Sequence, residues 1–183
     1  MATTKVGSSM AVKYADGKEQ SFTLAYDPFF ITGARVPDGK GGTLIAGGYY
    51  DINGKPILDP SAKGSEKPQF FSDSPDGMSL IKLDGASVPG VKGNTVFAVV
   101  QFEYTTEDAA GDDMYGLLPS PIAVLTLDQD KSSGKLSLVK YSVVDTTLAN
   151  GLWTTCGAAC RPGTRTSPAR NTSPTRRSPR TRP

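Results

Sequence analysis

The stretch Thr95-Val96-Phe97-Ala98-Val99-Val100-Gln101-Phe102-Glu103-Tyr104 is the most strand-like part of the sequence. It is dominated by β-branched and aromatic side chains, and it contains neither glycine nor proline. Such residues pack well on a pleated surface and are enriched in strands. This stretch therefore predicts a β-strand and indicates that the fold contains a β-sheet.

Outward from this stretch, the sequence alternates between short strand-like runs and turn residues. Asp16-Gly17 separates two alternating runs and indicates a hairpin. A second hairpin is expected where residues 128–134 separate two further runs, and Ser74-Pro75-Asp76-Gly77 is expected to form a turn. The expected strands cover residues 10–14, 21–26, 43–50, 69–72, 78–83, 95–104, 122–127 and 135–144.

Helical periodicity is hard to find anywhere, and 20 glycines and 14 prolines punctuate the chain at short intervals. Many short strands with such turns favour an all-β sandwich, barrel or propeller. Residues 105–120 interrupt the pattern with an acidic, irregular segment containing Glu107, Asp108, Asp112 and Asp113. It is interpreted as a solvated loop, and the alternative is a calcium-binding loop, although the spacing is not that of an EF-hand.

Charge divides the chain into two parts. Residues 1–157 carry 13 basic and 18 acidic side chains, whereas residues 158–183 carry seven arginines and no acid. The second part contains almost nothing apolar, so it cannot bury enough surface to offset its chain entropy. We expect an acidic β-rich body over residues 1–157 and a disordered Arg/Pro/Ser/Thr tail over residues 158–183.

Composition also limits the chemistry. The chain has no histidine, which removes Ser-His-Asp and Cys-His catalysis. Its two cysteines, Cys156 and Cys160, are too few for a zinc site and could form a local disulfide. No apolar run is long enough to span a membrane, and residues 1–10 do not read as a signal peptide.

The segment Gly151-Leu152-Trp153-Thr154-Thr155-Cys156-Gly157-Ala158 resembles the PhoX-type alkaline phosphatases. Four upstream phrases support the resemblance, which covers most of residues 21–158: Pro28-Phe29-Phe30-Ile31-Thr32-Gly33, residues 69–77, residues 97–105 and residues 118–125. The resemblance implies a β-propeller that hydrolyses phosphate monoesters with calcium and iron. It also implies a periplasmic or extracellular location, although no export signal is read here.

The resemblance makes Cys156 a metal ligand, and the alternative is a small buried hydrophobic residue. Trp153 is interpreted as a core or rim aromatic. In the family, paired glutamates follow the cysteine and help to hold the metal, but Ala169-Arg170-Asn171 stands in their place here. No catalytic set is therefore complete in this chain, and the metals are not expected to be retained.

The departure from the family pattern after Ala158 has a genetic explanation. After this point the family continues as Ser-Leu-Ser-Pro-Trp. The codons from Ala158 to Gly163 permit each of these residues if the third base of one codon is read together with the first two bases of the next. The expected glutamates, tyrosine and aspartate further on are also permitted. This agreement indicates that one base was lost near the Ala158 codon and that the tail is out of frame.

The sequence thus predicts an incomplete β-propeller of two to three blades, truncated and inactive as a phosphatase. The alternative is a non-catalytic β-rich binding or structural module whose basic tail binds anions. Nucleic acid is not an expected partner, because no aromatic residue is interleaved in the tail to stack on bases. No membrane partner is expected either.

Overall fold

The computed structural model describes residues 7–24, 26–161 and 165–168. The fold is all-β: these residues contain no α-helix, and a single 3₁₀ turn covers Thr147–Ala149. The described strands form one four-stranded and three two-stranded antiparallel sheets, and none of these sheets closes on itself. No helix in the described ranges has the length and hydropathy needed to cross a membrane.

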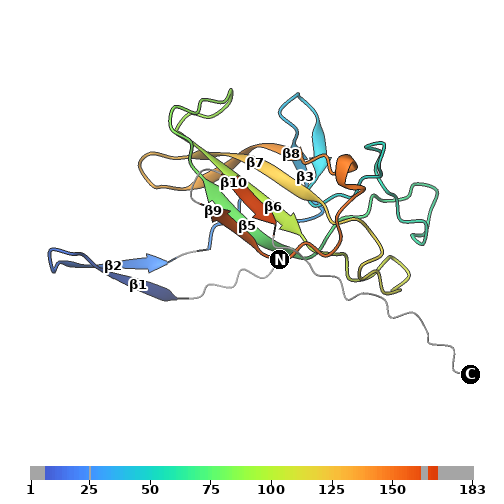
Figure 1. Cartoon of the computed structure of the whole chain (residues 1–183), viewed down its shortest axis with the longest axis horizontal. Helices are drawn as coiled ribbons and strands as arrows, with labels where there is room; N and C mark the ends of the chain where they lie inside the picture. The colour runs from blue at the N-terminus through green and yellow to red at the C-terminus, as the bar shows by residue number, and fades with distance from the viewer. Residues whose placement is uncertain (1–6, 25, 162–164, 169–183) are drawn as a thin grey trace, which may run out of the picture.

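The four-stranded sheet is the centre of the molecule (Figure 1). Its strands follow the chain in the order β5 (Pro75–Ile81), β6 (Asn94–Phe102), β7 (Ile122–Gln129) and β8 (Leu136–Val143). The strand predicted at residues 95–104 is confirmed as β6, and the hairpin predicted around residues 128–134 is confirmed as β7 and β8. In the connecting turn, the Asp130 carboxylate accepts the N–H groups of Ser132 and Ser133.

The core lies on one face of this sheet, because alternate residues of a strand point to the same side. Ala98 of β6 lies opposite Leu125 of β7, which in turn lies opposite Tyr141 of β8. All three are at most 1% exposed. The other buried members of the cluster are Val36, Ala46, Val96, Val100, Phe102, Ala123 and Leu127.

The short hairpin of β3 (Arg35–Pro37) and β4 (Thr43–Ile45) covers this face and leads into Ala46. It is fastened by Tyr141, whose Oη accepts the Gly47 N–H at 2.8 Å. Burial raises the pKa of Tyr141 well above its ordinary value of 10.0, so its hydroxyl is neutral at physiological pH. The strand predicted at residues 43–50 is shorter in the structure: it is β4, which ends at Ile45.

The Tyr141–Gly47 hydrogen bond gives a testable stability difference. We expect Tyr141→Phe to lower the free energy of unfolding by about 1–3 kcal/mol, because it leaves the buried Gly47 N–H without an acceptor. Tyr14→Phe is the matched control, since the Tyr14 hydroxyl donates to Gln20 at the exposed surface. Urea unfolding of both variants measures the difference, and equal losses would contradict the assignment.

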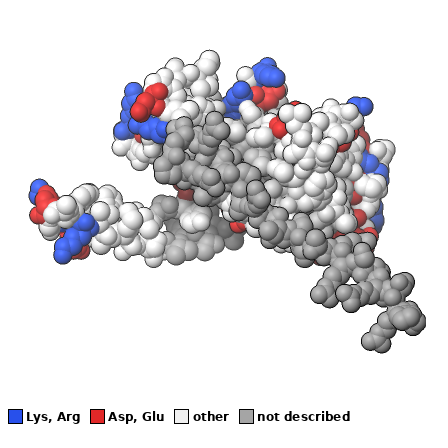
Figure 2. Space-filling model, viewed as in Figure 1, with Lys and Arg blue, Asp and Glu red and all other residues white. Residues whose placement is uncertain are grey.

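The predicted N-terminal hairpin is confirmed as β1 (Ser8–Lys13) and β2 (Glu19–Leu24), which project away from the main sheet (Figure 1). Both signs of charge are present at its tip (Figure 2), where Lys18 Nζ lies 3.0 Å from Asp16 Oδ2. Alternation across the pair places Met10, Phe22 and Leu24 on one side.

Two sequence expectations differ from the structure. Ser74-Pro75-Asp76-Gly77 does not form a separate turn: from Pro75 onward it belongs to β5, with a register irregularity between Pro75 and Met78. Pairing with β6 overrides the local turn preference there. In the tail, where disorder is predicted, the backbone forms the hairpin of β9 (Ala158–Arg161) and β10 (Arg165–Pro168), and β9 contacts β5. Residues 162–164 and 169–183 lie outside the described part.

Candidate functional site

The segment that resembles the phosphatase family, residues 151–158, is fixed to one end of the main sheet by Ser120. The Ser120 N–H donates to the Leu152 carbonyl at 2.6 Å, and its hydroxyl donates to the Glu103 carbonyl at 2.6 Å. Buried Thr155 adds a hydrogen bond from its hydroxyl to the Phe102 carbonyl at 3.3 Å. The segment therefore docks where β6 ends and where the chain enters β7.

Cys156 follows directly and is exposed with a free thiol. The next N–H, that of Gly157, donates to Asp76 Oδ2 at 2.9 Å. This bond joins residues 81 positions apart, so two phrases of the family resemblance meet in space. The alternative interpretation of Cys156 as a buried hydrophobic residue does not agree with its exposure.

The residues around Cys156 do not fit a calcium and iron centre. The chain has no histidine, and the described residues contain no group of three His, Cys, Asp or Glu side chains that could hold a metal ion. A thiolate can bind iron, and carboxylates can bind calcium, but each ion needs several ligands that converge. Cys156 is thus a single candidate ligand, and the Asp76 carboxylate bonded to its neighbour Gly157 already accepts a backbone hydrogen bond.

The acidic segment at residues 105–120 is irregular, as predicted. Its carboxylates accept hydrogen bonds from the backbone of the same loop. Asp108 Oδ1 accepts the N–H groups of Ala110 and Asp112, each at 2.9 Å, and Asp113 Oδ1 accepts the Tyr115 N–H at 2.9 Å. Buried Asp59 holds the loop from outside by accepting the Ala109 N–H at 2.8 Å. Such aspartate-capped turns are common in ordinary loops. The carboxylates of the described loop do not converge as calcium ligands.

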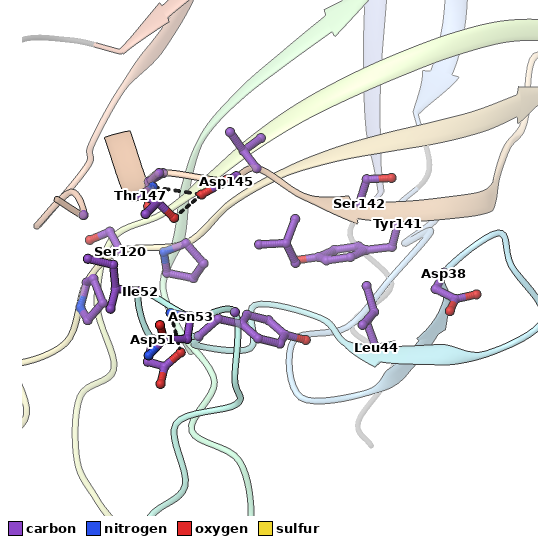
Figure 3. A pocket seen from close by; sticks show the side chains of 18 of the residues that line it. Asp38, Leu44, Asp51, Ile52, Asn53, Ser120, Tyr141, Ser142, Asp145 and Thr147 are labelled. Atoms are coloured by element: carbon purple, nitrogen blue, oxygen red, sulfur yellow. Dashed lines mark hydrogen bonds between the residues drawn. The ribbon is translucent and has the colours of Figure 1, made fainter. Parts of the chain in front are cut away.

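A groove of about 790 Å³ lies beside this end of the sheet (Figure 3). Residues 140–147 of β8 and its continuation form one wall, and residues 50–54 form the other. Asp51, Asn53, Asp145 and Thr147 gather at one end, whereas Asp38 lies at the opposite end (Figure 3). The half-exposed Trp153 also lines the groove, which agrees with its interpretation as a rim aromatic.

The groove carboxylates are held in their ionised form. The Lys55 N–H donates to Asp51, and the Thr147 hydroxyl donates to Asp145; these bonds are the main causes that lower the pKa of each carboxyl below its ordinary value of 3.8. The Lys40 N–H acts in the same way on Asp38. A hydrogen bond to the charged form favours that form. These three carboxylates are thus negatively charged at neutral pH, and the groove lining also contains Lys40 and Lys140.

Sequence reasoning identified Cys156 and Trp153 but missed Asp76, Ser120 and the whole groove. The sequence places Asp76 in an expected turn and in one phrase of the resemblance, and nothing in its spacing from Gly157 indicates that the two meet. The groove is built from three separate parts of the chain, around residues 38–54, 119–121 and 140–153. A one-dimensional pattern contains no signal for such a juxtaposition.

No family model, no curated protein and no solved structure matches this chain.

Proposed function

We propose that residues 1–157 are the N-terminal portion of a PhoX-like phosphatase that hydrolyses phosphate monoesters, inactive in the present form. The observation that carries the proposal is the contact between two phrases of the resemblance. Residues 151–158 carry the Cys156 phrase, and the Gly157 N–H reaches Asp76 in the other phrase at 2.9 Å. A resemblance that reflects common ancestry should bring its phrases together in this way.

The architecture supports an incomplete propeller. A four-stranded antiparallel sheet whose strands follow the chain order is the repeating unit of propeller blades. Strands β5 to β8 form one such sheet. Radial repetition leaves a complete propeller with only short, protected sheet edges, so a partial propeller leaves edges open. We propose that polypeptide encoded after the lost base would complete the ring, and that the intact protein is exported to the periplasm or outside the cell.

The proposed inactivity follows from the ligand set. Iron and calcium, which the resemblance implies, would supply charge neutralisation of the phosphoryl group. Of the ligands, only Cys156 stands in this chain at a position carried over from the family. The seven arginines of residues 158–183 would repel cations rather than bind them. The described residues therefore act as scaffold for a site whose other ligands lie elsewhere.

Phosphatase assays test this proposal. The purified 183-residue chain, supplied with calcium and iron, is expected to leave p-nitrophenyl phosphate intact. A gene with one base restored at the Ala158 codon is expected to yield a protein that hydrolyses it, and Cys156→Ser in that protein should reduce both bound iron and rate. Hydrolysis by the 183-residue chain at a rate equal to that of the frame-restored protein would contradict the proposal.

The nucleotide sequence around the Ala158 codon gives an independent check. We expect the downstream DNA to read Trp-Asn-Thr-His-Leu in another frame and to continue as a long open frame. A gene whose only open reading frame encodes the arginine-rich ending would contradict the proposed frameshift. In that case the alternative function, a non-catalytic β-rich binding module, would be the better description.

A further inference from the structure

The hairpin of β1 and β2 stands apart from the rest of the molecule (Figure 1). Among the described residues, no hydrogen bond or ion pair joins residues 8–24 to another part of the chain, and none of them belongs to the core cluster. In the same ranges, its two strands pair only with each other. An isolated two-stranded hairpin is marginally stable at best in water, and it gains stability when an apolar face is covered. The main sheet of the same chain does not provide that cover.

One face of the hairpin is apolar and the other is polar. Met10 of β1 lies opposite Phe22 of β2. Val12 and Leu24, each two residues further along its strand, share the same side. Tyr14 also belongs to this side, because its hydroxyl donates at 3.1 Å to the side chain that lies opposite Val12. We call these five residues the hairpin face. The opposite side carries Ser9, Ala11, Lys13, Glu19, Ser21 and Thr23.

The hairpin face is largely open to solvent. Met10 is 47%, Tyr14 46% and Leu24 42% exposed, and the other two residues are partly buried. Single exposed apolar side chains are ordinary on a protein surface, whereas a contiguous apolar patch rimmed by polar residues marks an interaction site. The five side chains share one face of one sheet, so they form such a patch.

Charge indicates what covers the hairpin face. Lys13 lies opposite Glu19 on the polar side, and Lys18 Nζ lies 3.0 Å from Asp16 Oδ2 at the tip. Two positive and two negative side chains give residues 8–24 a net charge of zero, and none of the four lies on the hairpin face. An acidic or a basic partner therefore gains nothing, whereas two copies of the hairpin meet without repulsion. Residues 169–183 contain no large apolar side chain that could cover the face instead.

We propose that two copies of this chain associate by packing their hairpin faces against each other. The contact uses the same patch on both copies, so it is isologous and closes at a dimer. Two stacked two-stranded sheets bury both apolar faces and leave both polar sides in water. With only five apolar side chains from each copy, the interface is small, and we expect a dissociation constant of about 10–100 µM. The inference does not depend on the phosphatase proposal.

Sedimentation velocity of the full 183-residue chain measures the association. Between about 1 and 200 µM, the chain is expected to pass from monomer to dimer without larger species. A monomer throughout this range would reject the proposal. Continued growth beyond the dimer would exclude a closed, symmetric contact.

Matched variants locate the contact. Leu24→Asp adds a charge to the hairpin face, and Thr23→Asp adds the same charge to the polar side of the same strand. Leu24→Asp is expected to raise the dissociation constant by about tenfold or more, whereas Thr23→Asp should leave it within about twofold. Met10→Asp and Ala11→Asp form the same pair of variants in β1. Equal effects on the two sides of the hairpin would contradict the proposal.

Hydrogen exchange of the unsubstituted chain keeps the test decisive if a variant hairpin does not fold. Amide protons of residues 8–24 are expected to gain protection as the chain concentration rises, whereas those of the turn at residues 130–134 should not change. Unchanged exchange in the hairpin when the chain dimerises would place the contact elsewhere and overturn the proposal.

Two other contacts between copies give different results. Attraction between the arginine-rich tail and the acidic body would be lost in about 0.5 M NaCl, whereas burial of the hairpin faces should persist. Met78→Asp, at an exposed apolar side chain of β5, would break a contact between one hairpin and the main sheet of the other copy. It should leave the proposed dimer unchanged. Loss of association in either experiment would overturn the proposal.

Discussion

Leu125→Ala is expected to lower the free energy of unfolding by about 3 kcal/mol. The Leu125 side chain is fully buried between the strands that carry Ala98 and Tyr141. Truncation of Leu125 removes apolar surface that folding buries. It also leaves a cavity that β6 and β8, which pair with β7 on either side, cannot move to close. Because small domains are stable by only about 5–15 kcal/mol, this loss is a large part of the total.

The matched control for this variant is Leu148→Ala. It makes the same chemical change at a side chain that is fully exposed, so its expected effect lies within about 0.5 kcal/mol of zero. Urea denaturation followed by circular dichroism measures both variants against the parent chain. If the two substitutions cost the same free energy, Leu125 is not in a packed core and the register of β6, β7 and β8 is wrong.

Gly93→Ala is expected to destabilise the chain by about 1–3 kcal/mol through a steric clash. A Cβ atom on Gly93 would lie 2.0 Å from the Gln129 carbonyl oxygen, and a backbone group cannot move aside as a flexible side chain can. The same glycine donates its N–H to Asp128 Oδ1 at 2.7 Å, so displacement would also weaken that hydrogen bond. The entrance to β6 and the end of β7 are held together at this point.

Gly7→Ala provides the control for the glycine substitution. Gly7 has open space around its Cβ position, so the added methyl group meets nothing. Its midpoint of thermal unfolding should equal that of the parent, whereas the midpoint of Gly93→Ala should fall by several degrees. An unchanged midpoint for Gly93→Ala would show that β6 and β7 do not approach so closely.

The charge pattern of the groove could not be predicted from the sequence, although each residue in it is ordinary. Asp51 and Asp145 each follow a local rule, in which an aspartate accepts the N–H group two residues later. That rule predicts two turns, and it does not predict that the turns face one another. The contact between Asp76 and Gly157 is of the same kind, because it depends on where β5 begins relative to Ser120 and its partners.

Local sequence was enough to predict the β class, the strand at residues 95–104, the hairpins around residues 16–17 and 128–134, and the irregular acidic loop. Each of these follows from side-chain alternation or turn chemistry within about ten neighbouring residues. Tertiary contacts were needed to show that the strand expected at residues 78–83 begins already at Pro75, that Cys156 is exposed while its neighbour Gly157 is bonded to Asp76, and that β8 borders a groove. These features depend on hydrogen bonds and packing between residues far apart in the chain, and local periodicity holds no record of such contacts.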